Sequence, residues 1–439
     1  MSGVQKAFVA TVLISLVTTG SFSPGYPEEI AEKEVLTREQ VVTMALRGNP
    51  GLIAARKGLD QAAAQTARAR VFPNPEVELG VENDALTAGE GEGALSVGVS
   101  QEIRTGGKRG YEIAIAGREK ERVQREIENL EREVAGEVRE VFGEVLFLQE
   151  RLRLQEEAIR GAREWVELTK GRFRAGYVPE FDLNLARIEL QERVREKGNI
   201  AKELTAAGTR INTLLGRAPE IDFMASGFLE AREEAMDLPA LMDQAYQSRP
   251  DLKGAEAAVE QFRSRLALAR ALRKPDLRIS LDYTYDTAVL DVNDRTVRDR
   301  DHLFGGKISI PLMILDKKRG EIEEAAVEEG RAVLEVAALR ARIAGEVALA
   351  YREWWQAEKD AAFIREEILP LASGNRDLTE EAYRLGKAGV LEVMEARRRD
   401  LETRLSGLEA AHRQYTALTA LERATAGNPV MSAGKGMER

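Results

Sequence analysis

The chain contains no cysteine and only two histidines, His302 and His412, among its 439 residues. The absence of cysteine excludes disulfides, thiolate metal sites and cysteine nucleophiles. With two scattered histidines, neither a histidine-based metal cage nor a conventional catalytic triad is favoured. Lysine and arginine are not gathered into a basic patch, which argues against a nucleic-acid partner. We therefore expect no enzyme activity, no cofactor and no bound metal.

Long apolar runs are also missing. Outside the N-terminus no stretch approaches the roughly 20 apolar residues that a transmembrane helix needs, so none is predicted. The apolar run 7–17 follows Lys6 and precedes small and turn residues up to Pro24. It falls in the window of roughly 7–15 residues typical of a signal peptide. We interpret residues 1–24 as an export signal; a buried N-terminal strand or helix is the alternative.

The sequence contains an internal repeat. An offset of 200 residues aligns Ala45–Leu52 with Ala245–Leu252. An offset of 210 residues then aligns Lys108–Gly110 with Lys318–Gly320, and later aligns Phe173 with Tyr383. Because these matches occur in the same order in both halves, they indicate a tandem duplication rather than chance similarity.

Each copy repeats one order of elements: a helix, a proline stop, a β-hairpin, a very long helix and a return helix. The first helices are expected at 52–70 and 252–273. The first repeat is expected at 36–216, with a β-hairpin at 76–104 and a helical hairpin at 110–215. An equatorial linker at 217–236 connects it to the second repeat at 237–427, which has a β-hairpin at 277–313 and a helical hairpin at 318–425. A flexible tail is expected at 428–439.

The strands are recognised by a period of two. In the second copy Leu277, Ile279, Leu281, Tyr283 and Tyr285 alternate with polar residues, which is the pattern of a half-buried strand. A polar loop is expected at 291–301 before the alternation resumes, and the first copy shows the same arrangement. The sequence therefore predicts four strands in two hairpins.

The long helices are recognised by apolar residues spaced alternately three and four apart, as in a coiled-coil seam. Each is expected to run for about 60 residues, on the order of 90 Å at the helical rise. Charged residues make up 31% of the chain, with a net charge of −10, and their interspersed signs suit a solvated helix surface.

Four strands cannot close a membrane barrel, since the smallest bacterial ones have about 8. An open sheet leaves unpaired edges, and in lipid these edges must be closed by other copies. The expected fold is therefore mainly α with a β-barrel portion shared between chains. A periplasmic coiled-coil protein with a small sheet cap is the alternative.

Three segments resemble a known family. The order of elements is similar to that of the TolC-type outer-membrane efflux channels over nearly the whole chain. The segments Phe72–Glu78 and Ser100–Arg109 resemble the CzcC and CusC branch, which serves heavy-metal efflux of the resistance-nodulation-division (RND) class. Ala382–Lys387 resembles the family's second helical turn.

The resemblance implies a homotrimer in which three copies of four strands form a twelve-stranded barrel in outer-membrane lipid. It also implies a helical barrel in the periplasm, with the shorter helices stacked end to end. A periplasmic adaptor and an inner-membrane RND pump are the implied partners, and heavy-metal cations the implied cargo. The absence of cysteine excludes the lipid anchor that many members carry. The alternatives are a periplasmic adaptor, or a channel for organic drugs or secreted proteins.

The resemblance also assigns site residues. Glu392 and Glu395 match acidic positions that line the periplasmic constriction; an ordinary solvated helix face is the alternative. Asp182, Tyr383 and Lys387 match or neighbour residues that latch adjacent hairpins, although Asp182 in a helix-capping role is equally compatible. The turns at Gly176, Gly386 and Gly389 are expected to contact the adaptor.

Overall fold

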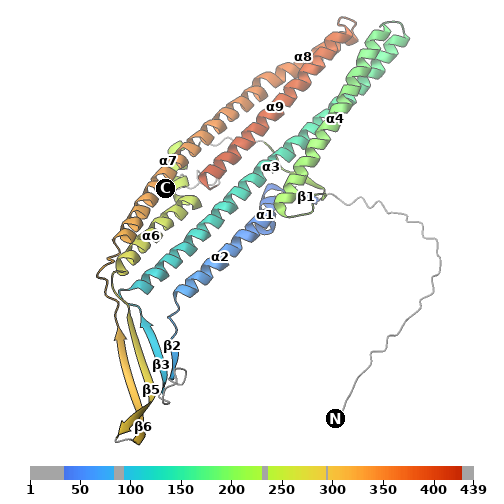
Figure 1. The fold of residues 1–439 in the computed structure, drawn as a ribbon. Coiled ribbons are helices and arrows are strands. Elements are labelled where there is room, and N and C mark those ends of the chain that lie inside the picture. Colours follow the sequence, from blue (N-terminus) through green and yellow to red (C-terminus); the bar gives the residue numbers. More distant parts are fainter. Residues whose placement is uncertain (1–33, 84–92, 230–235, 293–294, 428–439) are drawn as a thin grey trace, which may run out of the picture.

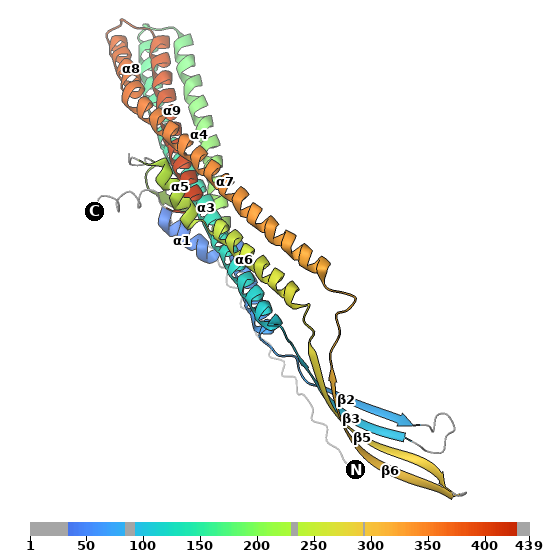
Figure 2. The same cartoon turned by 90° about the vertical axis from the view of Figure 1, so that its left-hand side faces the viewer.

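A computed structural model describes residues 34–83, 93–229, 236–292 and 295–427. The molecule is elongated, with a body of long helices at one end and a four-stranded sheet at the other (Figures 1 and 2). No helix in these ranges is long and apolar enough to cross a membrane. The predicted signal at 1–24 and the tail at 428–439 lie outside the described residues.

The helices of the first copy are α1 (Arg38–Gly48), α2 (Pro50–Ala69), α3 (Lys108–Arg174) and α4 (Glu180–Leu215). The sequence pattern identified α2 but not α1, which starts at a capping box made by Thr37 and Gln40. The second copy repeats the arrangement with α5 (Leu238–Ser248) and α6 (Pro250–Ala271). Proline suits the first turn of α2 and α6 because that turn leaves its N–H groups unbonded.

The shorter helices stack end to end in both copies. The Asn49 side-chain amide donates to the carbonyl of Leu214 at 3.0 Å, at the last turn of α4. Arg249, the equivalent residue 200 positions later, donates to the carbonyl of Ala424 at 3.2 Å, at the end of the return helix. Gly216 ends α4 with φ +69°, and a Cβ there would lie 2.3 Å from the Gly48 carbonyl oxygen. The close approach of the two helix ends therefore requires glycine.

The second long helix contains a π-helical turn that the sequence pattern did not predict. It consists of α7 (Arg319–Phe363), a π-helical turn at Ile364–Ile368 and α8 (Leu369–Arg384), followed by the return helix α9 (Val390–Thr425). Pro370 lacks an N–H group, and its ring clashes with the carbonyl four residues earlier in a regular helix. The wider π turn relieves this clash, and such turns are frequent at helix kinks and functional sites.

The four-stranded sheet is antiparallel with the order β2-β3-β5-β6. Its strands are β2 (Glu76–Asn83), β3 (Gly93–Ile103), β5 (Leu277–Val292) and β6 (Arg295–Ser309). The predicted polar loop at 291–301 is wrong, because β6 begins at Arg295. The alternation there is Arg-Asp-Arg-Asp, and an apolar pattern could not reveal a strand whose two faces are both charged.

The sheet has one apolar and one polar face. Directly opposed residues form apolar rows across the strands, such as Leu79, Val97, Tyr283 and Phe304. Leu281 belongs to this face and is 66% exposed in the single chain. The alternating apolar and polar residues of the strands therefore lie on opposite faces of the sheet, as predicted.

One element was not anticipated. The strands β1 (Glu34–Thr37) and β4 (Phe223–Ser226) pair in parallel, and β4 lies in the predicted linker. They pack on the core of the first copy, which contains Val138, Phe142 and Ile211. A second core, centred on Ile343, Val347 and Leu421, belongs to the second copy. The first core also contains Tyr415 of α9, so it joins the two repeats.

Candidate gate at the helical tips

The two helical hairpins end in matching turns at the tip farthest from the sheet (Figure 1). Gly176 and Gly386 adopt φ +76° and +73°. The amide after each glycine donates to a carbonyl five residues back, Tyr177 to Arg172 at 2.9 Å and Lys387 to Ala382 at 2.8 Å. Both turns are Schellman motifs, which need a left-handed residue and hence glycine. Gly389 differs from these two, since it is the N-cap of α9 at φ −85°.

Both predicted constriction residues are exposed on the first turns of α9. Glu392 accepts a hydrogen bond from the Gly389 amide at 2.8 Å, so one of its oxygens caps the helix. Glu395 forms an ion pair with Arg398 at 2.7 Å. Each carboxylate therefore already has one partner in the single chain, although both remain open to solvent.

The predicted latch residues are not joined to one another in the single chain. Asp182 lies half-buried in the first turn of α4, whose N-cap is Pro179 without a side-chain bond, so a capping role for Asp182 is wrong. Lys387 is exposed in the tip turn. The Tyr383 side chain is buried, and its hydroxyl has no hydrogen-bond partner among the described residues.

Instead, Tyr383 belongs to a stack of four side chains that joins the two hairpins. The ring of Trp165 on α3 lies 4.6 Å from the Tyr383 ring on α8. The Arg172 guanidinium covers the outer face of Tyr383 at 3.9 Å and donates to its carbonyl at 3.0 Å. The Arg397 guanidinium lies 4.9 Å from the Trp165 ring. We call these four residues the clasp.

Arg397 also makes two hydrogen bonds that strengthen the clasp. From α9 it donates to the Gly161 carbonyl of α3 at 3.0 Å and to Glu380 of α8 at 2.8 Å. Each cation–π contact contributes about 0.5–2 kcal/mol, depending on how far it is removed from water. Sequence reasoning missed the clasp because the two arginines resemble any other surface charge. The one available signal was Arg172 two helical turns after Trp165, on the same face.

Beside the clasp the hairpins form an open pocket of about 360 Å³, lined in part by Trp165 and Arg397. Asp400 of α9 is buried at its wall, and one carboxylate oxygen pairs with Arg376 at 2.7 Å and with Arg404 at 3.1 Å. Its other oxygen has no partner in the described chain. The hairpins are thus held at the tip by charge and aromatic contacts together with a buried apolar cluster that includes Val166, Leu183 and Val393.

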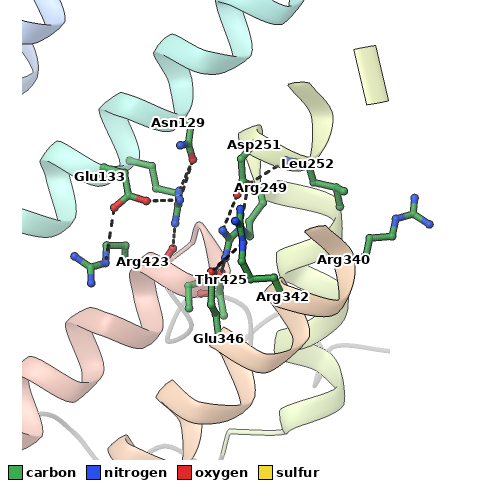
Figure 3. Close-up of polar contacts among 12 residues, drawn as sticks. Asn129, Glu133, Arg249, Asp251, Leu252, Arg340, Arg342, Glu346, Arg423 and Thr425 are labelled. Carbon is green, nitrogen blue, oxygen red and sulfur yellow. Dashed lines mark hydrogen bonds and ion pairs between the residues drawn. The ribbon is translucent and has the colours of Figure 1, made fainter. Parts of the chain in front are cut away.

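A second polar network fixes the opposite end of α9 (Figure 3). Arg249 is buried between Asp251 and Glu346, at 2.7 and 2.5 Å. Burial opposes the charge on Asp251, but the hydrogen bond and charge of Arg249, with the charge of Arg132, hold its pKa below the usual value. Arg132 of α3 donates to the Arg423 carbonyl. Two guanidinium groups from different repeats therefore neutralise the negative C-terminal end of α9.

The polar face of the sheet is strongly acidic. Among residues 76–83, 93–103, 277–289 and 297–309 its charged members are eight carboxylates and two cations, placed by the strand register: Glu76, Glu78, Glu82, Glu102, Asp282, Asp286, Asp299 and Asp301 against Arg278 and Lys307. In the described part of the chain no three acidic or histidine side chains converge as a metal site. An acidic face of this kind can attract cations.

The sequence model of the outer membrane efflux proteins matches residues 41–217 and 241–427, which are the two repeats. The chain belongs to this family. It is 26% identical to the cobalt-zinc-cadmium resistance protein CzcC of Cupriavidus metallidurans, over 96% of this chain and 97% of that protein.

Solved structures agree on the fold. The crystal structure of CusC gives a TM-score of 0.72 at 16% identity, covering 89% of this chain and 92% of CusC. The CmeC channel of Campylobacter jejuni gives 0.69 at 15% identity, covering 91% and 89% of the two chains. As an outer membrane efflux protein, the chain is a member of a family of transport proteins and not of enzymes, and the expected mainly helical, duplicated fold is confirmed.

Proposed function

We propose that this outer membrane efflux protein is the exit duct of a tripartite RND system that exports heavy-metal cations. The observation that carries the proposal is the sheet, which pairs an apolar face with a face on which carboxylates outnumber cations. Its edge strands β2 and β6 each pair on one side only within the described residues. Three copies would join these edges into a twelve-stranded barrel with lipid outside and an acidic wall inside.

The cargo follows from charge and from the relative. An acidic wall raises the local concentration of cations and disfavours anions. The named activity of CzcC, resistance to cobalt, zinc and cadmium, gives the corresponding class of cation. Since the described residues hold no coordinating cluster, the duct selects by field alone, and recognition of a particular metal belongs to the pump.

The gate lies at the helical tips. Glu392 and Glu395 would converge around the three-fold axis as a ring of carboxylates, while Asp182, Tyr383 and Lys387 would contact neighbouring hairpins. The turns at 175–179 and 385–389 would meet the periplasmic adaptor. The clasp holds the second hairpin against the first, so opening requires the adaptor to part it.

The pivot of this motion is the π turn at Ile364–Ile368. It lies between the Arg249 network, which fixes the base of α9, and the clasp near the tip. A Cβ at Gly407 of α9 would lie 3.3 Å from Leu369 and 3.6 Å from Ile364, so the small residue lets α9 pack directly on the pivot. Bending here would move α8 and the tip of α9 without disturbing the equatorial core.

Two experiments test the proposal. The mass of the detergent-solubilised protein should correspond to a trimer, and a monomer that inserts into bilayers would contradict the shared barrel. A strain lacking the gene should lose tolerance to cobalt, zinc or cadmium and regain it from a plasmid copy. Normal metal tolerance combined with new sensitivity to organic drugs would assign the duct to a drug pump instead.

A further inference from the structure

Near the start of β6, the positive and negative side chains lie on opposite faces of the sheet. Residues 298–301 read Arg-Asp-Arg-Asp, and the register places Arg298 opposite Val289 and Arg300 opposite Thr287. Because successive strand residues point to opposite faces, both arginines share the apolar face and both aspartates the polar face. Both arginines are exposed. Neither forms an ion pair within the described residues.

Along β5 and β6, the side chains on the apolar face change from aliphatic to aromatic. Leu281 is followed by the pair Tyr283 and Phe304, with ring centroids 5.1 Å apart. The next pair is Tyr285 and His302, at 5.2 Å, and the Tyr283 hydroxyl lies 2.6 Å from Nδ1 of His302. Apolar residues bounded by a band of aromatic side chains are characteristic of the membrane–water interface.

The two arginines follow immediately beyond this aromatic band. Six residues separate Ile279 from Tyr285, about 20 Å along a strand, which is comparable to the height of the apolar band of an outer-membrane protein. Arg300 then lies about 7 Å and Arg298 about 14 Å past the His302 position. This is the depth of lipid headgroups, and guanidinium groups bind phosphate in a two-pronged fashion.

We propose that Arg298 and Arg300 form a basic rim that binds the phosphate groups of anionic lipid in the outward-facing leaflet. The proposal rests on the proposed membrane location of the sheet. It commits to lipid because the rim continues the apolar and aromatic surface on the same face. On that face, residues 277–289 and 297–309 include no carboxylate, so no acidic group there competes with lipid phosphate. In a trimer the rim would carry six arginines.

The test compares vesicles of phosphatidylcholine alone with vesicles of equal parts phosphatidylcholine and phosphatidylglycerol. The purified full-length protein is mixed with each, and the bound fraction is measured by flotation. Wild type should prefer the anionic vesicles. One arginine near an anionic surface raises membrane affinity roughly fivefold. The variant R298Q/R300Q should therefore lower this preference by about 25-fold per chain. Raised salt should weaken the wild-type preference.

The matched control is D299N/D301N, which changes the same stretch of strand on the opposite face. It should keep the wild-type preference or raise it slightly. If R298Q/R300Q keeps the wild-type preference, or if the control lowers the preference as much, the basic rim is overturned. Either result leaves the proposed channel function intact. If wild type inserts into neither kind of vesicle, the proposed membrane location fails and the rim fails with it.

Discussion

The clasp gives the sharpest prediction. The change is Arg172→Gln, which keeps a polar side chain of similar length but removes the guanidinium over the Tyr383 ring at 3.9 Å and its bond to the Tyr383 carbonyl at 3.0 Å. If the clasp closes the gate, the variant should favour the open state.

The magnitude follows from these two contacts. A partly exposed cation–π contact contributes about 0.5–1 kcal/mol, and a hydrogen bond from a charged donor about 1.5–3 kcal/mol. Arg172 is half-buried, so we take the lower ends of both ranges. A loss of about 2 kcal/mol changes an equilibrium about 30-fold. The open fraction of each gate should rise by up to that factor.

The assay is single-channel recording in planar bilayers at fixed voltage, with the trimer mass and thermal midpoint measured in parallel. Lys170→Gln is the matched control, since Lys170 lies nearby on α3 and pairs only with Glu167 on the surface, at 3.0 Å. Its open fraction should equal that of wild type. Equal open fractions in both variants, with trimers intact, would refute the clasp as the closing contact.

Three further predictions concern the sheet, the tip and the base. Leu281→Arg places a charge on the apolar face and should cost roughly 2–4 kcal/mol of insertion free energy, whereas Asp282→Arg on the polar face should insert normally; folding yield in lipid vesicles measures both. Replacing Glu392 and Glu395 together by Gln should weaken cation selectivity, read from reversal potentials, and unchanged selectivity would place the constriction elsewhere. Asp251→Asn should lower the thermal midpoint at neutral pH. Because the pKa of Asp251 is lowered in the folded chain, its stabilisation is complete above the ordinary aspartate range near 4 and is lost as the pH falls through the folded value. The wild-type and variant midpoints should therefore converge in acid, and a gap that persists there would argue against an electrostatic role.

The sequence by itself determined the duplication, the helical hairpins and the faces of the sheet. These features depend on local periodicity: alternation places Leu281 on the apolar face, and heptad spacing together with Gly176 and Gly386 sets where each long helix turns back. Such patterns can be recognised in the sequence because they depend on residues that are close together along the chain. The family resemblance rested on the same local order and on a few turn segments.

Tertiary structure alone decided the contacts between segments far apart in the chain. Arg172 and Arg397 are indistinguishable in sequence from the many arginines that pair with a glutamate one turn away, and only the docking of α3 against α8 and α9 makes them a clasp. Likewise Arg249 reaches the end of α9 because the repeats fold around each other, and 298–301 becomes a strand because its partner β5 extends that far. Charged side chains carry no periodic signature of burial, so their roles appear only when the distant surface they meet is known.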